Sequence, residues 1–218
     1  MLQVNKMDIL IGLYIFCIFA SEVMWAKTFY LVNIFDHQFN ASVAIFLIPL
    51  VYSINDVIIE VFGKERMREI IKMSLLIIVL IISTSFFFTQ LPASTRFAAT
   101  EPAYDIIFGL SVRMSIASLL AFASADFLDV YVFSKLRQKL WTSKLWLRTN
   151  ISNIISEFID TFVFMVLAFY AFDQSFSSNF SFILSIGVPY WIIKCLMSVI
   201  GTPFVYLWVH WLQGEKSE

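Results

Sequence analysis

Residues 49–66 of this chain read PLVYSINDVIIEVFGKER, an apolar run that ends in a glycine and a cluster of charges. Asp56 and Glu60 are the only charged residues within the run, and basic residues follow it at once. This pattern is typical of a helix that crosses a bilayer and stops at a positively charged flank. Because Asp56 and Glu60 are four residues apart, they share one face of that helix. Acids in such a segment indicate a sheltered polar surface rather than contact with lipid.

The composition of the whole chain indicates a membrane protein. Of its 218 residues, 60% are hydrophobic and 17% aromatic, and only 14% are charged, against about 25% in a typical soluble domain. A soluble domain of this length cannot bury so much apolar surface. We therefore expect an all-α polytopic membrane helix bundle that forms a single transmembrane domain over residues 1–218.

Six segments are long enough to cross the hydrocarbon, which takes about 20 residues of helix. The first is too long for the core of a signal peptide, so it counts as a span. Pro49 and Pro203 fall inside spans and are expected to kink or unwind them locally. The six predicted spans cover residues 8–32, 43–62, 70–90, 105–134, 149–172 and 182–211.

The basic residues predict the orientation of the bundle. Arg96 is the only lysine or arginine in the first, third and fifth connectors. Because cytoplasmic flanks are enriched in lysine and arginine, both termini are predicted to face the cytoplasm. The termini and the other connectors carry the remaining flanking residues, which are Lys6, Lys64, Arg66, Arg68, Lys72, Lys135, Arg137, Lys139, Lys144, Arg148 and Lys216.

Besides Asp8, Lys72 and Asp105 in the first turn of their spans, ten charged residues fall inside the predicted spans. Each costs about 2.5–3.5 kcal/mol at the centre of a membrane helix, so they must face the bundle interior, pair, or reach the interface. Three of the helices carry a pair of acids on one face, and the basic residues fall in the outer halves. We therefore expect an interior polar cavity, basic towards the outside and acidic below. The ten residues are Glu22, Lys27, Asp56, Glu60, Arg113, Asp126, Asp129, Glu157, Asp160 and Lys194.

Simpler roles stay open for some of these charges. Glu60 and Asp129 are near enough to the cytoplasmic ends to reach the headgroups, or to pair with Arg66 or Arg137. For Glu22 the simpler role is that it only neutralises a cation. Lys27 and Lys194 are open to snorkelling to the outer interface, and Arg113 to acting as a structural counter-ion.

Asn55 and Asn153 are further polar candidates, since an asparagine inside a membrane helix either bridges helices or contacts a ligand. The two cysteines and two histidines are isolated from one another in the sequence, so neither a metal site nor a cofactor is expected.

Four stretches resemble the queuosine-precursor transporters, six-helix proteins of the bacterial inner membrane that are also grouped with vitamin uptake transporters. The specific part is the combination of N-D-x-x-x-E-x-F-G at 55–63, D-V-x-V-F-x-x-L-R at 129–137 and D-T-x-x-F at 160–164. The four stretches are FLIPLVYSINDVIIEVFGKERMREII, RMSIASLLAFASADFLDVYVFSKLRQ, NIISEFIDTFVFMVLAFY and PYWIIKCLMSVIGTPFVY.

The resemblance implies a transporter, not an enzyme, that imports a 7-deazaguanine for tRNA modification, either a pre-queuosine base or queuine. It implies no direct contact with nucleic acid. In the family an amide commonly precedes the aspartates of the fourth and fifth helices by three residues, where this chain has Asp126 and Glu157. That departure predicts a preference for an amine-bearing base over the neutral nitrile. The matching positions are Lys27, Asn55, Asp56, Glu60, Arg113, Asp129, Asp160 and Lys194.

The chemistry of such a base fits intramembrane carboxylates. A guanine-like edge offers N1–H and an exocyclic amine, and a carboxylate accepts both in a charge-assisted bidentate geometry. Aromatic rings stack on the flat heterocycle. The aromatic residues near the acids in sequence are Tyr52, Phe62, Tyr131, Phe158 and Tyr190.

The energy source stays open on the sequence alone. The phosphate-binding pattern G-x-x-x-x-G-K-[ST] is absent, so the chain is not itself an ATPase of that kind. Proton coupling, trapping of the base by a tRNA-modifying enzyme, and docking as a substrate-binding subunit on an energising partner are the alternatives, and a homo-oligomer is open. An ion channel and an intramembrane aspartyl protease are less favoured rivals, the latter because the sequence lacks G-x-G-D.

Overall fold

The computed structural model of this protein describes residues 5–24, 27–34, 37–109, 112–140 and 144–213. In these residues, six segments are helical, long enough and apolar enough to cross a membrane, which confirms the predicted all-α membrane bundle. The elements are α1 (Lys6–Met24), β1 (Thr28–Ile34), β2 (His37–Ser42), the 3₁₀ helix η1 (Val43–Phe46), α2 (Ile48–Phe62), α3 (Lys64–Phe88), α4 (Glu101–Phe108), α5 (Val112–Leu140), α6 (Leu145–Phe169) and α7 (Phe176–Gln213).

The first predicted span, residues 8–32, is too long. The helix α1 ends at Met24, and β1 and β2 then form an antiparallel hairpin in which Thr28 lies opposite Ser42. The sequence TFYLVNI of β1 is rich in aromatic and β-branched residues, which favour a strand. An apolar run alone does not distinguish the two structures, which is why the prediction extended the helix. Lys27 consequently lies between α1 and β1, outside a helix.

The fourth predicted span, residues 105–134, covers parts of two helices, because α4 ends at Phe108 and α5 begins at Val112. The helices α3, α6 and α7 each begin several residues earlier than predicted. Pro203 lies inside α7, as expected, together with Pro189. Pro49 instead occupies the first turn of α2, where its missing N–H costs no hydrogen bond, and the predicted span is interrupted just before it, between η1 and α2.

The helix α2 is the centre of the bundle. It packs against α1, α3, α5 and α7, and every residue from Val51 to Ile59 is buried. Gly63 ends α2 with a φ of 89°, a conformation that favours glycine, and the chain reverses into α3. This central position encloses Asn55 and Asp56 in protein on all sides, so neither side chain meets lipid.

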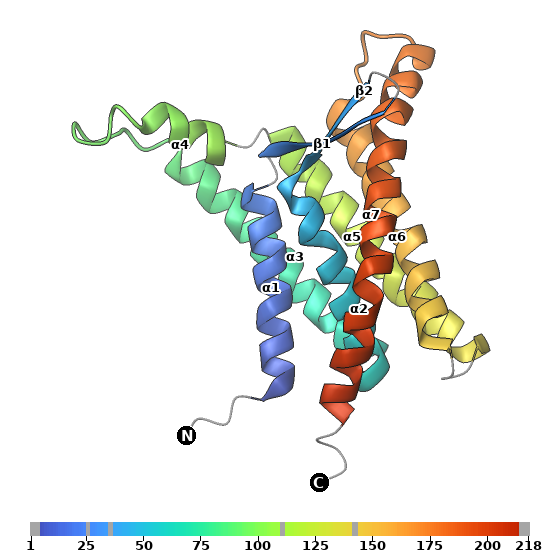
Figure 1. The fold of residues 1–218 in the computed structure, drawn as a ribbon. Coiled ribbons are helices and arrows are strands. Elements are labelled where there is room, and N and C mark those ends of the chain that lie inside the picture. Colours follow the sequence, from blue (N-terminus) through green and yellow to red (C-terminus); the bar gives the residue numbers. More distant parts are fainter. Residues whose placement is uncertain (1–4, 25–26, 35–36, 110–111, 141–143, 214–218) are drawn as a thin grey trace.

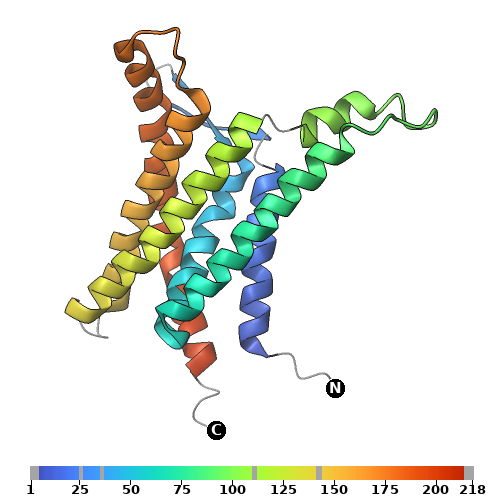
Figure 2. The same cartoon turned by 180° about the vertical axis from the view of Figure 1, so that it is seen from behind.

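The outer surface of the bundle is apolar, with exposed side chains such as Phe87, Leu196 and Ile200. The helices α5 and α6 run side by side, whereas α4 and the adjoining end of α3 lie away from α6 and α7 (Figures 1 and 2). The start of α1 and the end of α7 lie at the same end of the bundle (Figure 1). The hairpin lies at the opposite end.

Candidate functional site

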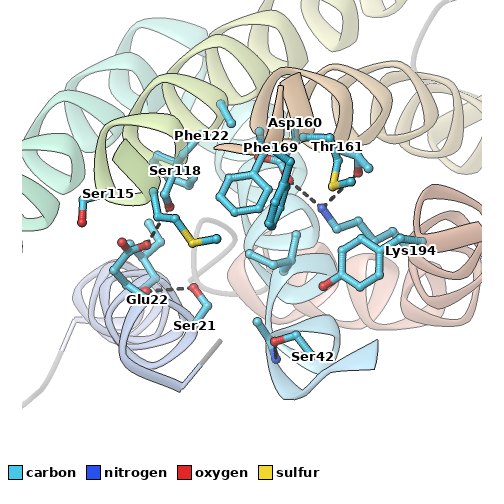
Figure 3. Close-up of a pocket in the computed structure, with 18 of the residues that line it drawn as sticks. Ser21, Glu22, Ser42, Ser115, Ser118, Phe122, Asp160, Thr161, Phe169 and Lys194 are labelled. Carbon is cyan, nitrogen blue, oxygen red and sulfur yellow. Dashed lines mark hydrogen bonds and ion pairs between the residues drawn. The ribbon is translucent and has the colours of Figure 1, made fainter. Parts of the chain in front are cut away.

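A cavity of about 320 Å³ lies in the half of the bundle nearest the hairpin, bordered mainly by α1, α5, α6 and α7, with residues of the hairpin, η1, α2 and α3 (Figure 3). Its volume is at the lower end of the roughly 300–1,000 Å³ of typical ligand pockets, so it suits a small ligand. Most of the wall is apolar. The polar and charged residues that line it are Ser21, Glu22, Thr28, Ser42, Ser115, Ser118, Asp160, Thr161, Tyr190 and Lys194.

An ion pair forms one wall of this cavity. The ammonium of Lys194 on α7 lies 2.6 Å from Oδ2 of Asp160 on α6 and donates a second hydrogen bond to Oγ1 of Thr161 at 3.3 Å. The Lys194 Nζ also lies 5.1 Å from the ring centroid of Tyr190. Because Lys194 is only 4% exposed, its charge depends on these partners. The pair presents a fixed donor beside a fixed acceptor.

The opposite wall carries an acid on α1. Glu22 is buried, lines the cavity and accepts a hydrogen bond of 2.8 Å from the Ser118 hydroxyl on α5. Figure 3 shows Glu22 and Ser118 across the cavity from Asp160 and Lys194. Among the charged residues expected in a polar interior, Glu22, Asp160 and Lys194 are those that line this cavity.

Aromatic rings complete the lining, and Tyr190 is the one of the five predicted aromatic residues that contributes. Tyr52 is buried but does not line the cavity, and Phe62, Tyr131 and Phe158 are at least 36% exposed. The other lining rings belong to Phe122, Phe164 and Phe169, of which Phe164 ends the D-T-x-x-F motif.

A second group of acids lies further along α2, α5 and α6, away from the hairpin. Asp126 is fully buried and accepts hydrogen bonds from the Tyr14 hydroxyl and, at 3.2 Å, from Nδ2 of Asn55. Asp129, one turn on, accepts a hydrogen bond of 3.1 Å from the Ser156 hydroxyl. These contacts join α1, α2, α5 and α6 through a polar core.

Two further acids of this group have few hydrogen-bonding partners. Within the described part of the chain, neither oxygen of Asp56 or Glu157 accepts a hydrogen bond of ordinary geometry, although both side chains are buried. Asp56 interacts electrostatically with Asp129 and Arg148. Glu157 interacts electrostatically with Lys194, which lines the cavity. The structure thus brings acids from α2, α5 and α6 together in a sheltered interior.

Glu60 lies at the far end of this acidic group, in an ion pair with two arginines. Its Oε2 is 3.3 Å from Nε of Arg137 and 3.2 Å from a terminal nitrogen of Arg148. The Arg137 guanidinium also donates to the carbonyl oxygens of Ile59 and Glu60, at 2.8 and 3.0 Å. Pairing of Glu60 with Arg137 is one of the simpler roles considered above. Arg148, treated above as a connector residue, is completely buried in α6.

Three other candidates lie outside the cavity lining. The side chain of Lys27 is exposed. Arg113 donates to the carbonyl oxygens of Leu167 and Tyr170, at 2.8 and 2.5 Å. It therefore supplies hydrogen-bond donors to carbonyl groups at the end of α6, which have no partner within the helix. Asn153 donates to the Ser198 hydroxyl at 2.6 Å and bridges α6 and α7.

Comparison with known proteins identifies relatives of this chain. Residues 42–208 match a family described as "Putative vitamin uptake transporter". A "Probable queuosine precursor transporter" of Bacillus subtilis is 28% identical over 89% of this chain and 82% of its own length. A protein of the same description from Haemophilus influenzae is 31% identical over 66% of this chain and 58% of its own length.

A "Queuosine precursor transporter" of Escherichia coli is 26% identical over 74% of this chain and 69% of its own length. These relatives confirm the resemblance seen in the sequence motifs. No solved structure matches this chain.

Proposed function

This chain belongs to the vitamin uptake transporter family, and from that premise we propose that it imports a queuosine precursor, a 7-deazaguanine base, across the bacterial inner membrane. The observation that carries the proposal is the charged cavity inside an apolar bundle, which offers a small polar solute a path that lipid does not.

The Asp160–Lys194 pair is the proposed recognition element for the base. A 7-deazaguanine carries, along one edge, the acceptor O6 followed by the donors N1–H and the exocyclic amine. Lys194 supplies a donor for O6, and the neighbouring Asp160 supplies acceptors for the two donors. Because the donor and acceptor are held 2.6 Å apart, they match the order of groups along this edge. The rings of Phe164 and Tyr190 offer faces for stacking.

We propose that the deeper acids form a second binding site for the base on its way into the cell. Tyr52 is buried between the two groups, since it interacts electrostatically with Asp160 of the cavity and with Asp126 and Glu157 beyond it. A base that leaves the cavity inwards would meet this group next. The proposed contacts there come from Asn55, Asp56, Asp126, Asp129, Asn153 and Glu157. Lys27, Glu60 and Arg113 stay predictions of the sequence, since their side chains lie outside the cavity lining.

We also propose that both termini face the cytoplasm. The junction of α2 and α3, the end of α5 and the start of α6 lie at the same end of the bundle as the start of α1 (Figure 1). The flanking lysines and arginines belong to these segments, whereas Arg96 belongs to the connector between α3 and α4. Such a bias marks the cytoplasmic side of bacterial membrane proteins.

An uptake assay tests the proposed function. Cells that can neither make nor import queuosine precursors receive this chain, are supplied with a labelled 7-deazaguanine, and are scored for queuosine in their tRNA. We expect wild-type protein to restore queuosine and Asp160→Asn to abolish the rescue at equal membrane abundance. The exposed Asp173→Asn on the α6–α7 connector is the matched control and should behave as wild type. Failure of the wild-type chain to restore queuosine from any 7-deazaguanine would overturn the proposal.

A further inference from the structure

Glu22 is the acidic group of the cavity for which the structure gives no cationic partner. Asp160 is paired with Lys194, whereas no ion pair to Glu22 occurs among the residues that the structure describes. Its carboxylate has the Ser118 hydroxyl as a hydrogen-bond donor, and it is only 8% exposed. With the three charged lining groups ionised, the cavity carries a net charge of −1 that a bound cation would neutralise.

A second polar group lies unused on the same wall. The Ser115 hydroxyl, one turn before Ser118 on α5, is 2% exposed, lines the cavity and has no hydrogen-bond partner in the described structure. Buried hydroxyls without partners are rare, because each loses the water that it would otherwise bind. Glu22, Ser118 and Ser115 therefore form a polar wall. On this wall the Glu22 carboxylate can accept further hydrogen bonds, and the Ser115 hydroxyl has no partner within the described structure (Figure 3).

From this geometry we propose that Glu22, oriented by Ser118, is the binding site for a protonated amine on the transported base. The inference rests on the proposed function: while the Asp160–Lys194 wall holds the guanine-like edge, an aminomethyl or alkylamino group at the other side of the ring system reaches the Glu22 wall. A buried carboxylate without a counter-charge is costly, and an ammonium ion removes that cost. A nitrile has no donor and leaves Glu22 uncompensated.

This assignment differs from the expectation that Asp126 and Glu157 select the amine. Both of those side chains lie outside the cavity lining, and Asp126 already accepts hydrogen bonds from Tyr14 and Asn55. Glu22 faces the cavity and has acceptor capacity left. The selective residue therefore comes from α1, and substitutions of Glu22 should change which base is preferred.

The test compares two labelled bases, 7-aminomethyl-7-deazaguanine and 7-cyano-7-deazaguanine, in cells that cannot make or import either. Wild-type protein should take up the amine in preference. Glu22→Gln keeps the size of the side chain and an acceptor for Ser118 but removes the charge. It should lower uptake of the amine about tenfold or more, the effect of turning a charge-assisted hydrogen bond into a neutral one, and leave uptake of the nitrile unchanged.

Controls separate this inference from the proposed function. Glu101→Gln on α4, outside the cavity, should leave the preference unchanged, and Ser118→Ala should shift it in the direction of Glu22→Gln by a smaller factor. A parallel loss of both bases at equal membrane abundance, or no loss of either, overturns the role of Glu22. If Glu22→Gln does not accumulate in the membrane, the two unlabelled bases are compared as competitors of labelled uptake in cells with the wild-type protein. Equal competition by the two bases overturns the role of Glu22. Uptake of neither base by wild-type protein overturns the proposed function instead.

Discussion

The ammonium of Lys194 and the carboxylate of Asp160, 34 residues apart in the sequence, lie 2.6 Å from each other across the contact between α6 and α7. The pair joins two helices and forms one wall of the cavity. We therefore expect it to affect both stability and transport, and variants can separate the two effects.

Lys194→Met leaves the Asp160 carboxylate without its cation inside the bundle. Removing one partner of a buried pair costs about 3–5 kcal/mol, so the single variant should lose thermal stability in detergent. The double variant Lys194→Met/Asp160→Asn should regain most of that stability, because no uncompensated charge remains. Uptake should stay lost in both, since both lack the Lys194 ammonium that is proposed to donate to O6 of the base. Recovery of uptake together with stability in the double variant would show that the pair is structural only.

Glu60→Gln should destabilise the protein strongly, because it removes the counter-charge of the fully buried Arg148. We expect a loss of about 3–5 kcal/mol in the free energy of unfolding. Glu65→Gln is the matched control: its ion pair with Arg68 is exposed on the surface, where such pairs contribute about 0–1 kcal/mol. Thermal denaturation of the two purified variants side by side measures the difference, and equal melting temperatures would contradict the prediction.

Tyr14→Phe removes one of the two hydrogen bonds that hold Asp126 between α1, α2 and α5. Because both groups are buried, the carboxylate oxygen loses its donor without gaining water, and we expect a destabilisation of about 1–3 kcal/mol. Tyr30→Phe on the exposed face of β1 should have no such effect. Thermal unfolding monitored by tryptophan fluorescence provides the measurement. A Tyr14→Phe protein as stable as wild type would contradict the interior contact.

Fusion of reporter enzymes tests the orientation of the bundle. A phosphatase that is active only outside the cytoplasm should be active when fused after Arg96 and inactive when fused after Gln213. A fluorescent protein that folds only in the cytoplasm should give the opposite result. The reverse outcome at both positions would invert the proposed topology.

The sequence predicted the features that depend on the periodicity and placement of charge. The six spans follow from the lengths of the apolar runs, and the burial of the acids of α2, α5 and α6 follows from the cost of charge in lipid. The hairpin did not follow, since the run from Thr28 to Ile34 is apolar enough for either a helix or a strand. Which acids line the cavity and which lie deeper also depends on the rotation of each helix about its own axis. The spacing of residues within one helix does not define that rotation.

Partners that come from other helices were harder to predict. Tyr14 is an ordinary aromatic residue of an apolar run, and nothing nearby in the sequence marks its contact with Asp126, 112 residues away. Arg148 stands at the start of a span, where an exposed flank is the usual outcome, and it became buried because Glu60 approaches it from α2. Ser118 is a small polar residue whose importance depends only on its distance from Glu22.

The central helix α2 has 15 residues, a length of about 22 Å at the usual rise per residue, whereas the hydrocarbon layer is about 30 Å thick. The hairpin and η1 precede it, and residues of both, with the first turn of α2, border the cavity. The α-helical part of this span therefore stops short of the hairpin end, and η1, whose residues also border the cavity, completes the 20-residue span Val43–Phe62.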